Sequence, residues 1–207
     1  MSKRWIFILI SFMVSGTNAQ QIVLRSGDLL FRGVSGKLSE AIDQVTQTGK
    51  ETHFSHMGLV ERKGHDIFVL HAAPGGGSCR IPLEEFLHPE GEAVEVVAYR
   101  LRKPWQRTVP AALKRAERML GKPYNNHYYP VDTAYYCSDF VYRAFAPDSV
   151  FERKPMTFRD PQTGEFSPAW AEHYGRLGMA IPEGLPGCNP NGMASSDKLE
   201  RLGVVRE

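Results

Sequence analysis

A cysteine at the start of an apolar stretch could serve as a nucleophile. The residues at positions i, i+3, i+4 and i+7 of this stretch share one face of a predicted helix, and they are Cys137, Phe140, Val141 and Ala144. Free backbone N–H groups and the helix dipole favour an anion at a helix N-terminus. We therefore expect the pKa of the thiol to fall from about 8.5 towards neutrality and expect an oxyanion to be held there. The alternative is a small buried side chain without a chemical role.

A cysteine nucleophile needs a base to take its proton and a third group to orient that base. Two histidines, His56 and His71, lie on predicted strands at 52–60 and 66–72. A two-residue turn at 63–64 would pair these strands and set the two imidazoles directly opposite each other. Any other loop with an even number of residues keeps both on one face of the sheet, because side chains alternate with a period of two.

The same three side chains allow other interpretations. Either histidine could be a buried residue bonded to backbone groups, and two histidines with a cysteine are also a known ligand set for zinc. No HxxxH or CxxC pair accompanies them, so we predict no metal and no cofactor. The nearby acids have simpler roles, Asp139 as a favourable charge in the first turn of the helix and Asp28 as a turn residue.

Three cysteines, Cys79, Cys137 and Cys188, are an odd number, so in an exported protein one thiol stays free or pairs with another chain. A disulfide between Cys79 and Cys188 would leave Cys137 free for catalysis. The sequence does not decide this pairing, because both cysteines lie in segments rich in glycine and proline.

Residues 1–19 have the plan of a secretory signal peptide. Lys3 and Arg4 precede an apolar run at 5–14, and small and polar residues follow as far as Ala19. The apolar run is too short to span a bilayer. We therefore expect cleavage after Ala19, no integral membrane anchor afterwards, and a periplasmic or secreted protein.

Residues 20–207 are predicted to form one domain without repeats or linkers. The whole chain has 25 basic and 23 acidic residues, and removal of the signal peptide would take away two basic residues and no acidic one, leaving 23 of each. A formal charge near zero does not indicate nucleic acid as a partner. The oligomeric state stays open.

The predicted sheet extends on both sides of the histidine strands. Alternating or apolar runs bounded by turn residues predict further strands at 26–33, 78–81, 93–101 and near 203–205. Apolar residues at helical spacing predict helices at 36–48, 108–120 and 167–177, with a helical turn at 82–87. Residues 146–166 lack periodicity and are interpreted as a long loop or lid over a pocket.

Five short segments follow one another in a specific order: Gly27-Asp28-Leu29-Leu30-Phe31, Ser55-His56-Met57-Gly58-Leu59-Val60, Leu70-His71-Ala72-Ala73-Pro74, Gly121-Lys122-Pro123-Tyr124 and Tyr136-Cys137-Ser138-Asp139-Phe140-Val141. Together they resemble the permuted papain-like cysteine hydrolases of the YiiX/YebB-like group, in the NlpC-type superfamily. Ordinary papain-like enzymes place the cysteine before the histidine. Here the histidine comes first, as in the permuted group and in the lecithin retinol acyltransferases.

The resemblance implies an α+β, circularly permuted papain-like (NlpC-type) fold, with a small antiparallel sheet packed on the helix that bears the nucleophile. It makes Cys137 the nucleophile, His56 the base and His71 the residue that orients the base. Many relatives have glutamate at the third position, whereas the histidine here offers no fixed negative charge. Tyr124 matches a tyrosine near the site and would contact the substrate or the oxyanion, although an aromatic residue there also fits a plain core role.

The sequence thus predicts an exported thiol hydrolase, an amidase or peptidase, that cleaves an amide through a thioester on Cys137. Its partner would be a cell-envelope peptide or a lipid-like amide. The alternatives are an acyltransferase or thioesterase acting on lipid acyl groups, and a lipid- or peptide-binding protein without turnover.

Overall fold

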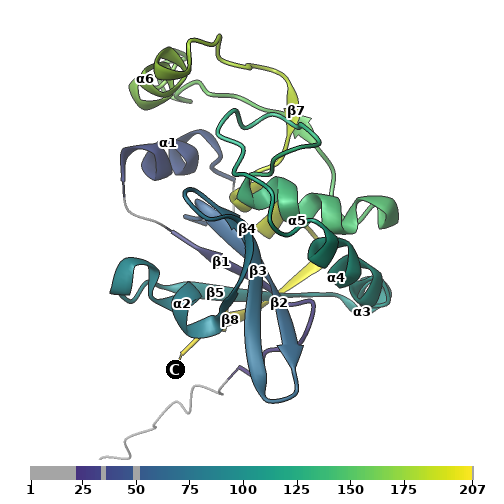
Figure 1. The fold of residues 1–207 in the computed structure, drawn as a ribbon. Coiled ribbons are helices and arrows are strands. Elements are labelled where there is room, and N and C mark those ends of the chain that lie inside the picture. Colours follow the sequence, from purple (N-terminus) through teal and green to yellow (C-terminus); the bar gives the residue numbers. More distant parts are fainter. Residues whose placement is uncertain (1–21, 34–35, 49–51, 207) are drawn as a thin grey trace, which may run out of the picture.

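The computed structural model describes residues 22–33, 36–48 and 52–206. Its centre is a six-stranded antiparallel sheet in the order β4-β3-β2-β1-β5-β8 (Figure 1). The strands are β1 (Leu29–Arg32), β2 (His56–Lys63), β3 (Asp66–Ala73), β4 (Gly77–Pro82), β5 (Val96–Leu101) and β8 (Leu199–Val204). A second, two-stranded sheet joins β6 (Lys154–Pro155) to β7 (Pro186–Gly187). The predicted α+β class is confirmed.

Seven α-helices and two short 3-10 helices are found in the described part of the chain. The α-helices are α1 (Lys37–Val45), α2 (Leu83–Leu87), α3 (Lys103–Gln106), α4 (Val109–Arg118), α5 (Cys137–Phe145), α6 (Pro168–Leu177) and α7 (Pro190–Ala194). The 3-10 helices are η1 (Pro89–Gly91) and η2 (Ala146–Asp148). No helix among the described residues is long and apolar enough to cross a membrane. The predicted signal peptide at 1–19 and its cleavage site lie outside the described residues.

The predicted strands and the longer predicted helices are present, with shorter boundaries in most cases. The sequence did not predict α3, α7 or the small β6-β7 sheet, and the last strand is longer than expected. The segment 146–166 contains only η2 and β6 and otherwise has no regular secondary structure, as predicted.

The predicted turn between β2 and β3 was misplaced by one residue. The two-residue turn lies at Gly64-His65, so Lys63 pairs with Asp66 and Leu59 with Leu70. Gly64 has a φ of 64°, and this left-handed conformation suits glycine at the first central position of a tight turn. His56 and His71 are therefore diagonal neighbours instead of directly opposed residues. They stay on the same face, because the register shifts by two residues.

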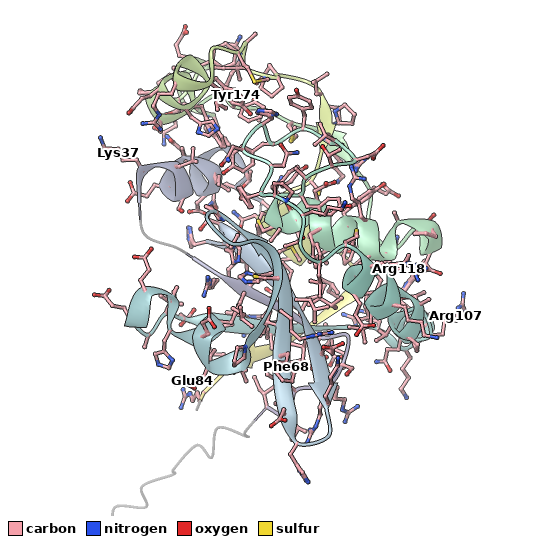
Figure 2. All side chains as sticks on the ribbon, viewed as in Figure 1. Lys37, Phe68, Glu84, Arg107, Arg118 and Tyr174 are labelled. Atoms are coloured by element: carbon pink, nitrogen blue, oxygen red, sulfur yellow. The ribbon has the colours of Figure 1, made fainter. Side chains whose placement is uncertain are left out.

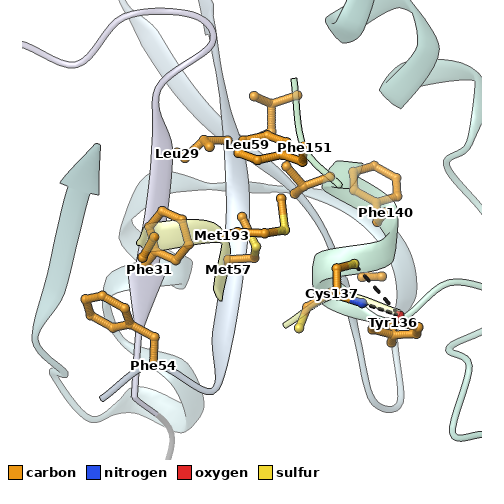
Figure 3. Packing of buried hydrophobic residues seen from close by; sticks show 14 of the residues in the cluster. Leu29, Phe31, Phe54, Met57, Leu59, Tyr136, Cys137, Phe140, Phe151 and Met193 are labelled. Carbon is orange, nitrogen blue, oxygen red and sulfur yellow. Dashed lines mark hydrogen bonds between the residues drawn. The ribbon is translucent and has the colours of Figure 1, made fainter. Parts of the chain in front are cut away.

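The two faces of the sheet carry separate hydrophobic clusters. Side chains that alternate along each strand go to one cluster or the other, so Leu29 and Phe31 join the larger cluster while Leu30 joins the smaller one. Figure 3 shows Phe31, Met57 and Leu59 of the sheet in the larger cluster with Phe140 and Phe151, and Figure 2 shows side chains filling the space between the sheet and the helices. The smaller cluster packs around Phe86 of α2.

Helix α5 is almost entirely inside the protein. Seven of its nine residues are buried, and the helix packs against β2, β3 and α4. Burial of each large apolar side chain contributes about 1.5–3 kcal/mol, so the packing of α5 fixes its N-terminus firmly against the sheet. The chain before the helix contributes Tyr136 as an extended N-cap residue.

Candidate active site

The thiol of Cys137 lies at the N-terminus of α5, as the sequence predicted, and the residue is 4% exposed. Its sulfur is 3.9 Å from the carbonyl oxygen of Ser55, the residue that precedes β2. The backbone N–H groups of Met57, Ser138 and Cys137 itself also face the sulfur. The thiol therefore rests against the backbone at the beginning of β2, among donors that could bind a negative charge.

The expected low pKa of this thiol is not found. Burial raises the pKa of Cys137 to about 11, and the opposing effect of the backbone N–H groups of Ser138 and Met57 is smaller. Helix N-termini lower a thiol pKa when the thiolate also reaches water or a cation, whereas this sulfur lies in the hydrophobic core. At neutral pH Cys137 is a protonated thiol, so a base has to remove its proton during the reaction.

His56 and His71 form a buried hydrogen-bonded pair. Nε2 of His56 is 2.8 Å from Nδ1 of His71, and the two residues are 5% and 4% exposed. Their rings meet edge to face, with centroids 5.1 Å apart, and both rings pack on Phe86 of α2. Because this bond uses Nε2 of His56, its Nδ1 is the nitrogen left to accept a proton.

The thiol and the imidazoles belong to different clusters. Cys137 packs in the larger cluster with Met57, while both imidazoles contact Phe86 of the smaller one. Within the described residues no hydrogen bond joins the thiol to either ring. The thiol and the histidine pair come together at the start of β2, where the backbone on either side of His56 contacts the sulfur of Cys137. Catalytic hydrogen bonds are often long in a substrate-free site and tighten only with substrate.

Arg32 is a further residue of this region that the sequence analysis missed. It is the direct cross-strand partner of His56 in the β1-β2 pairing and is 6% exposed. Its Nη1 donates a hydrogen bond to the carbonyl oxygen of Phe86, and its Cζ lies 4.3 Å from the centre of that ring. Its position in an otherwise apolar core strand, two residues after Leu30, was the available signal.

Burial and the charge of Arg32 affect both imidazoles. Desolvation, then the neighbouring His71 and Arg32, hold the pKa of His56 well below its usual value. Desolvation and then Arg32 lower the pKa of His71 to about 4. Burial also lowers the pKa of Arg32 to about 10, but the guanidinium remains charged at neutral pH, and Cys137 acts in the opposite direction by favouring that charge. Both imidazoles are consequently neutral near pH 7.

A cavity of about 280 Å³ opens beside the thiol. Cys137 lines it together with Ser55 and Ser138, while most of its wall comes from other parts of the chain. Apolar and aromatic side chains dominate this wall: Ile42, Val45, Tyr128, Tyr136, Pro155, Met156, Phe158 and Trp170. Lys154, which is exposed, is its only lysine or arginine among the described residues. The segment 146–166, predicted to act as a lid, supplies residues 154–158 of the wall.

The tyrosines that line this cavity are Tyr128 and Tyr136, and the predicted Tyr124 is not among the lining residues. Tyr124 lies behind Tyr128, with ring centres 6.2 Å apart, and forms an isolated β-bridge with Tyr135. Burial raises the pKa of Tyr124 well above its usual value, and the nearby Cys137 adds to this effect. The role of Tyr124 in binding substrate or oxyanion stays a prediction. Tyr128 was hard to predict because the loop at 121–136 contains several tyrosines without periodicity.

The disulfide considered between Cys79 and Cys188 is not formed, and all three cysteines are free. Cys79 lies on the edge strand β4 opposite His71, whereas Cys188 follows β7 and lines the cavity beside Cys137. Tyr136 and Ser138 hold Cys188 in place: the Tyr136 hydroxyl lies 3.8 Å from its sulfur and accepts from its backbone N–H at 3.3 Å, bonds that Figure 3 shows as dashed lines. Ser138 Oγ donates to the carbonyl oxygen of Cys188 at 3.0 Å.

The acids near the site serve the fold. Asp139 is completely buried and binds Arg143 and Arg153, each at 2.8 Å, and Asp28 binds Arg100 at 2.7 Å. Among the described residues, no three His, Cys, Asp or Glu side chains are grouped so that they could hold a metal ion.

The comparisons with known proteins point in one direction. The family described as "Permuted papain-like amidase enzyme, YaeF/YiiX, C92 family" matches residues 23–203. The crystal structure of metalloprotein yiiX from Escherichia coli O157:H7 has the same fold, with a TM-score of 0.71 and 21% sequence identity over 88% of this chain and 98% of that chain. A comparison with curated proteins gave no match.

Proposed function

This chain belongs to the permuted papain-like amidase family and is a cysteine hydrolase, and from that premise we propose that Cys137, His56 and His71 are its catalytic residues. Cys137 would be the nucleophile and His56 the general base, while His71 would orient His56. The observation that carries the proposal is the buried His56–His71 hydrogen bond of 2.8 Å at the start of β2, where the thiol also rests. A base held by a third polar group is what a protonated thiol requires.

The reaction starts from a neutral thiol and a neutral imidazole. As Sγ of Cys137 attacks the substrate carbonyl carbon, the thiol proton moves to Nδ1 of His56, and the carbonyl electrons move onto its oxygen. The backbone N–H groups that face the sulfur, including that of Cys137, are placed to bind this oxyanion. His56 then gives the proton to the leaving amine, and the amide C–N bond breaks to leave a thioester on Cys137.

Water completes the cycle. His56 takes a proton from the water molecule that attacks the thioester, and returns it to the sulfur as the acid product leaves. Concerted proton removal is required because burial holds the pKa of Cys137 near 11, so a preformed thiolate is not available. The thiol also has to leave its contact with the Ser55 carbonyl before it reaches Nδ1 of His56.

The cavity supports a substrate with an apolar group next to the scissile amide. Its walls are largely apolar and aromatic, and burial of a matching acyl chain or side chain would provide the binding energy. We propose a lipid-like amide or a cell-envelope peptide with an apolar residue at this position. The sequence plan of residues 1–19 supports export to the periplasm or outside the cell, where such substrates occur.

Trapping of the acyl-enzyme tests the proposal. Protein incubated with a panel of N-acyl amides at varied chain length is quenched in acid and measured by intact-protein mass spectrometry. We expect an added acyl mass on Cys137 and none in Cys137→Ala, whereas the matched variant Cys79→Ala retains it. An acyl mass that persists in Cys137→Ala would refute the assignment of the nucleophile. Release to water or to an added amine separates hydrolysis from acyl transfer.

A further inference from the structure

Arg32 is a buried cation without an acidic partner. Among the described residues no carboxylate forms an ion pair with it, and its Nε is buried without a hydrogen-bond partner. An unpaired charge in the core is costly, so the position calls for an explanation other than stability. Its neighbours are Phe86, whose carbonyl and ring it contacts, and His56 across the β1-β2 pair.

The three basic side chains form a row across the sheet. Arg32 lies on β1, His56 on the adjacent β2 and His71 on the next strand, β3. All three pack around one ring: the imidazole centres of His56 and His71 are 5.7 and 5.6 Å from the centre of Phe86, and the Arg32 guanidinium carbon is 4.3 Å from it. A fixed positive charge this close makes a second positive charge on either imidazole unfavourable.

Either histidine could donate the hydrogen bond between them, and only one of these directions leaves His56 able to accept the thiol proton. If Nε2–H of His56 donates to Nδ1 of His71, then Nδ1 of His56 is free to accept the thiol proton. If His71 were protonated, its Nδ1–H would donate to Nε2 of His56. His56 would then carry its own proton on Nδ1, and this tautomer cannot act as the base. A carboxylate in place of His71 would not reverse the hydrogen bond in this way, because an ionised carboxylate only accepts hydrogen bonds.

We propose that Arg32 is a positioning residue, which keeps His71 neutral so that its Nδ1 accepts the hydrogen bond from His56 even in acidic solution. The inference rests on the proposed function of the His56–His71 pair and explains how a histidine can replace a carboxylate as the third residue. It also accounts for the buried charge without a partner. The same charge attracts the developing thiolate of Cys137.

Other ionisable groups near the pair do not replace Arg32 in this role. Cys79 on β4 lies opposite His71, and burial and the nearby Glu85 of α2 raise its pKa, so this thiol is neutral below pH 7. The thiol of Cys137 on α5 is also neutral there. Arg32 is the charged group that lowers the pKa of both imidazoles, after desolvation.

Nitrogen NMR of the imidazoles tests this directly. In Cys137→Ala protein labelled with ¹⁵N-histidine, which cannot turn over substrate, we expect His56 and His71 to keep neutral shifts and one tautomer from pH 7.5 down to about pH 5. Titration of His71 with a midpoint near 6.5 in this protein would overturn the proposal, and this measurement needs no change at Arg32.

The variant Arg32→Gln, with Arg32→Lys as the matched control, gives the second measurement. We expect the His71 midpoint to rise by about one pH unit or more in Arg32→Gln and to stay low in Arg32→Lys. The acid limb of kcat/KM should move to higher pH by a similar amount, a shift that general loss of stability would not produce. An unchanged His71 midpoint in Arg32→Gln would overturn the proposal. Activity that survives in Cys137→Ala would refute the proposed nucleophile instead, while the NMR result would still decide the role of Arg32.

Discussion

Two buried charges lie at or near helix α5, and their surroundings differ. Asp139, in the first turn of α5, is fully buried and held by two arginines, Arg143 and Arg153. Arg32, on β1, is buried almost as deeply but contacts only a backbone carbonyl and an aromatic ring. The protein therefore neutralises one buried charge within the fold and leaves the other to act on its neighbours.

The difference matches a structural role for Asp139 and the role proposed above for Arg32. One of the two arginines that bind Asp139 also holds a neighbouring loop, since Arg143 donates to the carbonyl oxygen of Val131 and binds Asp132. Arg32 binds no loop of this kind, and its electrostatic effect falls on His56 and His71. We expect substitutions at the first site to change stability and substitutions around the second to change activity and its pH dependence.

The largest effect is expected at His56. Loss of the general base in His56→Ala should lower kcat/KM by about 10²- to 10⁴-fold with a modest effect on folding. The matched control is His53→Ala, because that imidazole is mostly exposed and binds Asp43 outside the site. Steady-state kinetics with an N-acyl amide at pH 7.5 measures both variants. Equal loss in the two would show that His56 has no special role as a base.

The next largest effect, a loss of stability, is expected at Asp139, the buried carboxylate that two arginines bind. Asp139→Asn removes the buried anion that the half-buried Arg143 and Arg153 share, and breaking a fully buried pair from one side costs about 3–5 kcal/mol, which is the upper limit expected here. The control is Asp148→Asn, since Asp148 pairs with Arg115 nearer to the surface. Urea unfolding followed by fluorescence gives the free energy of unfolding for both. A loss at Asp139 no larger than at Asp148 would contradict the structural role.

Stability should also depend on pH through His71. Its pKa is about 4 in the folded protein and about 6.5 when unfolded, so between these values the unfolded chain binds more protons. The contribution is fully present above pH 6.5 and is lost as the pH falls towards 4, by on the order of 3 kcal/mol. Urea midpoints between pH 7 and 4 measure this slope. His71→Asn should flatten it, and an equally steep slope in that variant would assign the effect to other groups.

The smallest change in stability is expected at Arg32, the buried cation without an acidic partner among the described residues. Arg32→Met removes a buried charge and fills similar space with an apolar side chain beside Phe86, so the free energy of unfolding should change by less than about 1.5 kcal/mol. Thermal and urea unfolding at pH 7.5 measure it. A loss as large as that of Asp139→Asn would mean that Arg32 serves the fold and would remove the contrast between the two sites.

Much of the fold could be predicted because its signals are local. The apolar spacing from Cys137 to Ala144 predicted α5, and alternation with turn residues predicted the strands that carry His56 and His71. The turn between them was misplaced by one residue, since only the backbone conformation at Gly64 fixes which two residues form it. The small β6-β7 sheet and α7 were missed because they are short and depend on tertiary contacts.

The sequence by itself determined the order of the motifs, with those of His56 and His71 before that of Cys137, and this order pointed to the permuted family that the family model shows. Side-chain periodicity also determined that both imidazoles share one face, because a shift of two residues does not change the face. Only the tertiary structure decided the protonation states of Cys137 and the two histidines. Burial raises the pKa of Cys137 against the effect of the helix N-terminus, and Arg32 acts on the imidazoles from another strand. Desolvation depends on everything packed around a group, so it cannot be derived from local spacing.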